Sequence, residues 1–330
     1  MRFSIALVLA AGMGTAVAHA GDWRAQTVDT PARMLAIESH QGQALVNAGG
    51  LWYRMALDGP AATLHFVDTP ARPAPPDGAL GDGRIAQGRG DIRRAWFAEP
   101  TSRYDHGILG DKIEAGTLVI ETREGRIHTL RLRDDAVFED LEPRLADLDG
   151  DGHEEIVVVK SYLARGAALA VIALRKGRYE IVAETPPLGS AHRWLNPAGI
   201  GDFNGDGKTD IALVRQPHVV GELQLWTYSE GRLRQTGSLA DTSNHAIGSR
   251  VLGLSASADF DGDGTPDLAL PSLDRRHLRI VSFVPVAHDI ASIALPAPAA
   301  TNIAPMARGN AAPALAVGLA DGSLVVIRND

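Results

Sequence analysis

Short apolar runs alternate with glycine-containing turns along most of the chain. Three such runs are Ile156–Val159, Ile211–Val214 and Leu268–Leu270, and turns such as Lys176–Gly177 and Glu230–Gly231 separate the runs that follow them. Strand-like runs joined across a short gap containing glycine are typical of antiparallel hairpins. The pattern therefore predicts an all-β fold of short antiparallel strands.

An acidic segment of nine residues precedes each of these three runs. The segments span residues 147–155, 202–210 and 259–267, with spacings of 55 and 57 residues. A period of this length indicates a repeat architecture. In each unit one strand enters the acidic segment, a second leaves it, and two more form a hairpin. Four-stranded antiparallel units repeated along a chain are typical of β-propeller blades.

Weaker copies of the unit extend the pattern to both ends of the chain. Strand-like runs lie within residues 33–55, 91–130 and 314–327, so the sequence predicts six blades, with seven as the alternative. The last unit lacks a fourth strand, whereas residues 23–28 are a spare strand before the first. We expect this N-terminal strand to complete the last blade, because ring closure removes exposed sheet edges. Residues 21–330 would then form one domain.

The acidic segments have the composition of cation-binding loops. Side-chain oxygens at positions 1, 3, 5 and 9, a carbonyl at position 7 and glycine at position 6 suit a hard cation, and many carboxylates on a flexible loop favour Ca²⁺ over Mg²⁺. Position 12 is apolar in all three segments, which excludes an EF-hand. We therefore expect about three structural calcium ions. The predicted ligands are Asp147, Asp149, Asp151, His153 and Glu155; Asp202, Asn204, Asp206, Lys208 and Asp210; and Asp259, Asp261, Asp263, Thr265 and Asp267.

The three segments resemble the FG-GAP or VCBS-type repeats of integrin α-subunit propellers and of secreted bacterial proteins. The shared pattern is D-x-D/N-G-D-G-x-x-D/E, and the resemblance is strongest over residues 140–285. It implies a β-propeller with calcium between the first two strands of a blade. The chain lacks the literal Phe-Gly and Gly-Ala-Pro signatures, and three of the six predicted units lack the loop. The resemblance leaves the function open, because propellers have many functions.

The N-terminal residues are typical of a secretory signal peptide. Arg2 is followed by the apolar run Ile5–Ala11 and by Ala18-His19-Ala20, which fits an A-x-A cleavage site. We therefore expect residues 1–20 to direct export to the periplasm or the medium.

The chain has 330 residues, no cysteine and a net charge of −8, which excludes thiolate chemistry and makes a nucleic-acid partner unexpected. No apolar stretch is long enough to span a membrane.

Histidine and arginine gather in the connections opposite the acidic segments. If the segments join the first and second strands of each blade, the connections at the other end carry an unusual group of polar and aromatic side chains. The candidate ligand-binding residues are Arg103, Tyr104, Asp105, His106, His192, Arg193, Trp194, His218, His245 and Arg250. Arginine can bind a carboxylate or phosphate through two parallel hydrogen bonds, and the ring of tryptophan or tyrosine can stack on a ligand.

These residues support several functions. The favoured one is a binding module, without enzymatic activity, that meets a protein or glycan partner through this face. The alternative is an enzyme, a lyase or hydrolase of polysaccharide or another anionic substrate, with acid–base catalysis by Tyr104, Asp105 and His106. A transition-metal site made of imidazoles and an ordinary solvated rim are two further interpretations. The sequence does not choose a partner or an oligomeric state.

Overall fold

Strands form nearly all of the regular structure. The computed structural model describes residues 22–40, 42–59 and 61–329, and within them one 3₁₀ turn, η1 (Gly107–Leu109), accompanies the strands. The expectation of an all-β fold is therefore confirmed. No helix formed by these residues has the length and apolar character needed to cross a membrane. The predicted signal peptide, residues 1–20, lies outside the described residues.

Three sheets each consist of four consecutive antiparallel strands. The first contains β2 (Met34–His40), β3 (Gln43–Ala48), β4 (Leu51–Asp58) and β5 (Ala61–Val67). The second contains β15 (Leu195–Gly201), β16 (Asp210–Arg215), β17 (Glu222–Ser229) and β18 (Arg232–Leu239). The third contains β19 (Ala256–Ala258), β20 (Asp267–Pro271), β21 (His277–Ser282) and β22 (His288–Ala294).

A fourth sheet joins the two ends of the chain. It contains β23 (Ala299–Arg308), β24 (Ala311–Leu319), β25 (Leu324–Asn329) and β1 (Trp23–Val28). β1 pairs antiparallel with β25, from Trp23 opposite Asn329 to Val28 opposite Leu324. The N-terminal strand therefore completes the last four-stranded unit, as the sequence predicts.

The fifth sheet has nine strands, because one short strand joins two units. The units are β6 (Ala86–Gln87), β7 (Ile92–Thr101), β8 (Glu114–Thr122) and β9 (Ile127–Arg131), and β11 (Arg144–Ala146), β12 (Glu155–Tyr162), β13 (Gly166–Arg175) and β14 (Arg178–Glu184). The joining strand β10 (Ala136–Phe138) pairs with β8 on one side and β12 on the other. The repeat pattern does not predict β10, which lies in the connection between the two units.

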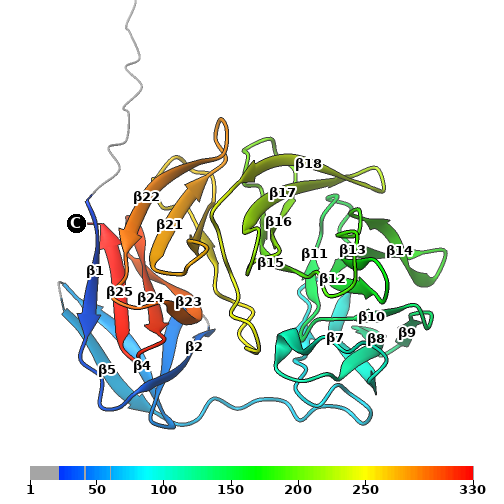
Figure 1. Ribbon diagram of the computed structural model, residues 1–330, viewed down its shortest axis with the longest axis horizontal. Coiled ribbons are helices and arrows are strands. Elements are labelled where there is room, and N and C mark those ends of the chain that lie inside the picture. The colour runs from blue at the N-terminus through cyan, green and yellow to red at the C-terminus, as the bar shows by residue number, and fades with distance from the viewer. Residues whose placement is uncertain (1–21, 41, 60, 330) are drawn as a thin grey trace, which may run out of the picture.

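The units follow one another around a common centre (Figure 1). Residues 68–85 run between β5 and β6, and the loop after β18 extends toward the middle of the molecule. Neighbouring sheets are also joined by side chains: Asn302 Nδ2 of β23 donates a hydrogen bond of 3.0 Å to the carbonyl oxygen of Ile37 in β2.

Burial explains why some strands are wholly apolar and others alternate. Ile156–Val159 of β12 are fully buried, because neighbouring strands and sheets cover both faces of that strand. The outer strands β9 and β18 instead alternate between partly buried and exposed residues. Each fully buried aliphatic side chain contributes about 1.5–3 kcal/mol to folding, so the inner strands carry most of the core.

The connections form two opposite ends of the units. Residues 147–155, 202–210 and 259–267 connect the first two strands of three units, and we call these loops the acidic end. The connections β7–β8, β16–β17, β14–β15 and β18–β19 meet at the other end. We call that end the histidine end, after the side chains that gather there: Tyr104, His106, His192, Trp194, His218 and His245.

Candidate metal and ligand sites

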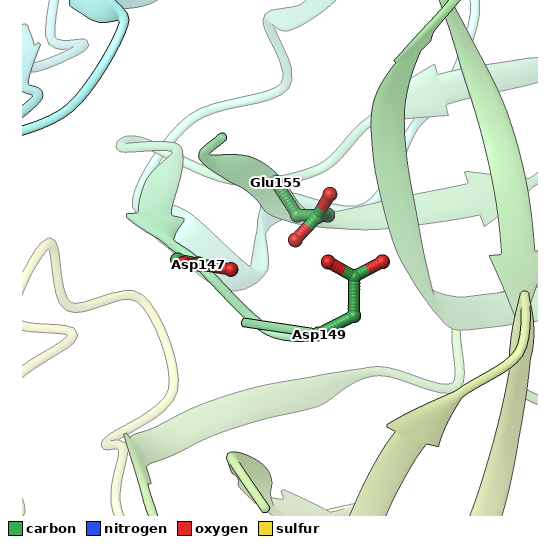
Figure 2. A group of neighbouring side chains, drawn as sticks. All are labelled: Asp147, Asp149 and Glu155. Atoms are coloured by element: carbon green, nitrogen blue, oxygen red, sulfur yellow. The ribbon is translucent and has the colours of Figure 1, made fainter. Parts of the chain in front are cut away.

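The first acidic loop brings three carboxylates together. Figure 2 shows Asp147, Asp149 and Glu155 facing a shared space, and each offers an oxygen within 4.8 Å of the others. Asp259, Asp261 and Asp263 of the third loop form a second group of the same kind. Hard oxygen donors in a flexible loop are the ligands that Ca²⁺ takes.

Backbone hydrogen bonds give the loops their shape. Asp147 accepts hydrogen bonds from the amides of Gly150 (2.7 Å) and Gly152 (3.0 Å), and Asp259 accepts the equivalent pair from Gly262 and Gly264. Gly150 and Gly152 have φ values of 76° and 86°, a left-handed conformation that glycine adopts without strain. The carboxylate at position 1 is thereby fixed at the centre of the loop.

The carboxylate at position 5 is held in the same way in each loop. It accepts a hydrogen bond of 2.7–2.9 Å from the amide at position 7, which belongs to His153, Lys208 or Thr265. The accepting residues are Asp151, Asp206 and Asp263. In the second loop, Asp202 and Asn204 also accept hydrogen bonds from Asp206 N, at 3.1 and 2.9 Å.

The acid at position 9 lies at the buried edge of each loop. Burial raises the pKa of Glu155 and of Asp267 to about 7, and it raises the pKa of Asp210 as well. Asp267 Oδ1 is buried without a hydrogen-bond partner among the described residues. A cation would satisfy such an oxygen and favour the ionised carboxylates, so the residues present fit Ca²⁺.

An apolar residue at position 2 anchors each loop to the core. Leu148, Phe203 and Phe260 are at most 2% exposed. The ring of Trp23 in β1 packs edge-on against Phe260, with the ring centres 5.9 Å apart. The acidic loops are therefore parts of the packed structure, and an ion held there would stabilise the fold.

The histidine end contains two clusters of rings. In the first, the ring centre of His192 lies 5.4 Å from that of Tyr104 and 5.2 Å from that of His106. The hydroxyl oxygen of Tyr104 accepts a hydrogen bond of 2.8 Å from His192 N. Burial raises the pKa of Tyr104, whereas the imidazole of His192 is exposed to solvent.

The second cluster is made of Trp194, His218 and His245. The ring centres of Trp194 and His245 are 4.7 Å apart, and His218 Nε2 lies 3.0 Å from His245 Nδ1. His245 Nε2 lies 2.9 Å from the carbonyl oxygen of Ser249, so that nitrogen carries the proton. His245 Nδ1 is then an acceptor for His218 Nε2, and the neutral ring of His218 has its acceptor at Nδ1.

Both imidazoles of the second cluster are neutral at physiological pH. Burial, with the positive charges of Arg275 and His106, lowers the pKa of His218 to about 4. Burial also lowers the pKa of His245 to about 3, and the hydrogen bond to Ser249 only partly offsets it. A neutral imidazole has one hydrogen-bond donor and one acceptor. Such a ring suits the hydroxyl groups of a ligand better than it suits a charged ligand group.

Glu139 connects the two clusters, with its buried side chain on one and its backbone carbonyl oxygen on the other. His106 Nδ1 lies 2.5 Å from Oε1 of Glu139, whose side chain is fully buried, and Ser161 donates to the other oxygen. Trp194 Nε1 donates a hydrogen bond of 3.0 Å to the carbonyl oxygen of Glu139. Burial raises the pKa of Glu139, and the hydrogen bond from His106 opposes this change.

Sequence reasoning missed Glu139 and Ser161. The available signal was the short apolar run Ala136–Phe138, which ends directly before Glu139. Because β10 is buried between β8 and β12, the residue that follows it carries a carboxyl group into the interior. A buried carboxylate must be hydrogen-bonded, and His106 and Ser161 supply the partners.

The other predicted ligand-binding residues mostly bind the protein itself. Arg103 Nε donates to the carbonyl oxygen of Ala136 at 3.0 Å, and Arg193 Nη1 donates to that of Leu188 at 3.0 Å. Asp105 pairs with Lys112 at 2.6 Å. Arg250 pairs with Asp82 and with Asp111, each at 2.7 Å. These groups position the connections, and the histidines are the side chains left to meet a ligand.

The histidines do not form a metal cage like the acidic loops. Within residues 22–40, 42–59 and 61–329, the groups of three or more histidine or acid side chains with converging ligand atoms are those of the first and third acidic loops. The rings of His218 and His245 are held by hydrogen bonds, to each other and to the carbonyl oxygen of Ser249.

Comparison with family models identifies the acidic repeats. Residues 147–213 and 202–270 match the FG-GAP-like repeat. The chain thus contains FG-GAP-like repeats in two adjacent units, as the sequence motif indicates. Comparison with curated proteins finds no match.

Solved structures share the fold. The rhamnogalacturonan lyase YesW is 13% identical with a TM-score of 0.50, over 92% of this chain and 68% of the lyase. BBS1N, solved in complex with ARL6DN, is 11% identical with a TM-score of 0.51, over 94% of this chain and 97% of that one. The Photorhabdus luminescens Tc holotoxin is 16% identical with a TM-score of 0.43, and the chain covers 14% of it. The first two define a β-propeller-like fold for this chain.

Proposed function

We propose that the chain is an exported, calcium-stabilised β-propeller that binds a glycan at its histidine end. The six four-stranded units would be the blades, with β1 and β25 in the blade that closes the ring. The ligands named above in the three acidic loops would hold calcium, which neutralises the carboxylates and stabilises the loops. Residues 1–20 would direct the chain out of the cytoplasm.

The convergence of four histidines from separate connections supports a ligand site. Holding the fully buried His245 and the half-buried His218 neutral beside Trp194 requires satisfied hydrogen bonds, and in those bonds Nδ1 of His218 is an acceptor. His192 offers an exposed imidazole in the adjacent cluster. Of the two partner classes that the sequence suggests, a glycan fits better, because its hydroxyl groups both donate and accept hydrogen bonds.

The calcium part of the proposal is tested by metal analysis. The chain without residues 1–20 would be exchanged into metal-free buffer, supplied with calcium and analysed by elemental mass spectrometry. About three calcium ions per chain are expected from the ligand sets. A chain that retains no calcium would contradict the loop assignment.

The glycan part is tested by binding. A panel of immobilised glycans would identify a ligand, and calorimetry would compare wild type with His192→Ala and His218→Ala. Each variant should weaken binding about fivefold to fortyfold, the loss of one or two hydrogen bonds. His65→Ala is the matched control, because His65 is exposed on the outer strand β5. Unchanged binding by both cluster variants would exclude the histidine end.

The hydrogen bond between His106 and Glu139 favours catalysis as a second candidate. An imidazole oriented by a buried carboxylate is the arrangement of a general base, and it would act in a lyase or hydrolase of polysaccharide. If the chain cleaves the glycan it binds, His106→Ala should reduce turnover about 100-fold or more with little change in binding. If no new reducing or unsaturated ends form after long incubation, the catalytic candidate is excluded and the binding module is the remaining function.

A further inference from the structure

A groove lies between two neighbouring units, and its lining contains none of the rings of the two histidine clusters. It has a volume of about 590 Å³ and runs between β9, β12 and β14. Its charged and aromatic lining includes Arg131, Arg133, Asp135, Lys160, Tyr162 and Arg165. The volume is that of a small-molecule binding site, and the open shape admits a chain that enters and leaves.

One wall of the groove is rigid. The hydroxyl of Tyr162 donates a hydrogen bond of 2.6 Å to Glu184, and Lys160 Nζ donates to the same carboxylate at 2.7 Å. The side chain of Lys160 is 12% exposed. The guanidinium of Arg165 stacks on the Tyr162 ring, with Cζ 3.9 Å from the ring centre. A ligand would therefore meet a positive group that is already positioned.

Among the described residues, two arginines of the groove have no carboxylate partner. Arg131 pairs with Glu99 at 3.3 Å, but neither Arg133 nor Arg165 has a carboxylate within 4.0 Å in the described ranges. The side chains of Arg133 and Arg165 are exposed, so a ligand can reach them. A guanidinium binds a carboxylate through two parallel hydrogen bonds.

The rest of the lining selects among anions. Asp135 and Glu180 lie in the same groove, so a ligand must place uncharged groups beside them and its carboxylates beside the arginines. The two acids are also acceptors for hydroxyl groups, and Leu130 and Ile181 offer apolar surface to the C–H face of a sugar ring. Phosphate and acidic peptides lack this combination of one carboxylate with neighbouring hydroxyls.

We propose that this groove binds a uronic-acid oligosaccharide. Arg133 and Arg165 would bind the sugar carboxylates, while Asp135 and Glu180 would accept hydrogen bonds from the hydroxyls. The groove shares no lining residue with the two ring clusters, so this proposal does not depend on the function proposed for the histidine end.

The test uses the calcium-loaded chain and a defined probe. Calorimetry would measure binding of trigalacturonate, with neutral galactotriose, triglutamate and inorganic phosphate as comparison ligands. The variants are Arg133→Gln and Arg165→Gln. Arg232→Gln is the control, because it removes the same charge from an exposed position on β18. Melting temperatures would establish that each variant is folded.

Each groove variant should weaken trigalacturonate binding at least about tenfold, the loss of a charge-assisted hydrogen bond. The control and the variants His192→Ala and His218→Ala should bind it as wild type does, which separates this site from the histidine end. Galactotriose should bind at least about tenfold more weakly, because it lacks the carboxylates. Equal binding by wild type and both groove variants would overturn the proposal. Triglutamate or phosphate binding as tightly as trigalacturonate would overturn the assignment to a uronic acid.

Discussion

The two ends of the units are built in opposite ways. At the acidic end one motif is used three times, and each loop gathers its carboxylates from nine consecutive residues. At the histidine end, Tyr104, His192, His218 and His245 come from four different connections, and no motif repeats. A local motif can be lost from one unit without changing the others. A cluster assembled from several units requires the whole fold, so we expect stability to depend on the acidic end and ligand specificity on the histidine end.

Removal of calcium should have the largest effect, and it tests whether stability depends on the acidic end. If each of three ions is present at about 100 times its dissociation constant, removal costs about 8 kcal/mol in the free energy of unfolding. The midpoint of thermal unfolding should then fall by about 15 °C when a chelator is added, measured by calorimetry. Added magnesium should not restore it. An unchanged midpoint would mean that the acidic loops are only hydrogen-bonded turns.

The acidic end was predictable because its chemistry is local. The spacing of acids and glycines within residues 147–155 specifies both the turn and the carboxylate that each amide contacts. What the motif did not reveal is the role of position 2, where Leu148, Phe203 and Phe260 enter the core. That role depends on how the neighbouring strands pack.

Truncating one of these anchors should have the next largest effect. Phe203→Ala removes a fully buried ring beneath the second loop and should lower the free energy of unfolding by about 3–5 kcal/mol. Urea denaturation of the calcium-loaded chain measures the change. Phe66→Ala is the matched control, because that ring is 63% exposed on β5 and its loss should change stability by about 0.5 kcal/mol or less. Equal effects of the two variants would show that position 2 does not anchor the loop.

The sequence predicts which histidines lie at the histidine end, but not which partners hold their side chains. Alternation of connections between the two ends places His106, His192, His218 and His245 together. The partners that fix them are Glu139, at the end of a strand that no repeat predicts, and the carbonyl oxygen of Ser249. Arg103 and Arg250 were expected to meet a ligand, whereas their nearest partners lie within the protein. The partners of Arg103 and Arg250 depend on distances in the folded chain, which the spacing of residues in the sequence does not predict.

A buried acid near the histidine end should respond to pH. Burial raises the pKa of Glu114 to about 10 from the ordinary value of 4.5, and the charges of Glu139, Asp111, Asp82 and Asp140 contribute. The unfolded chain releases this proton above pH 4.5 while the folded chain keeps it, so stability is lost as pH rises from 4.5 to about 10.

Glu114→Gln should therefore stabilise the protein. The gain should be small at pH 4 and about 3 kcal/mol at pH 7, from about 1.4 kcal/mol for each pH unit above the ordinary pKa. Denaturation at both pH values measures it. Glu124→Gln, in the exposed turn between β8 and β9, is the control and should show no such gain. A Glu114→Gln variant that is less stable at pH 7 than wild type would mean that the carboxylate is ionised in the fold.

The smallest effect should come from an arginine that holds the connections together. Arg250 bridges Asp82 and Asp111 at 2.7 Å each, and its side chain is 48% exposed. Solvent screens such a pair, so Arg250→Gln should lower the free energy of unfolding by about 1 kcal/mol or less, and salt at 1 M should remove the difference. Glycan binding should be unchanged, because Nε and Nη2 of this guanidinium already donate to the carboxylates of Asp82 and Asp111. A variant that keeps its stability but loses the glycan would place Arg250 in the ligand site, and the histidine end would then bind through charge as well as through neutral imidazoles.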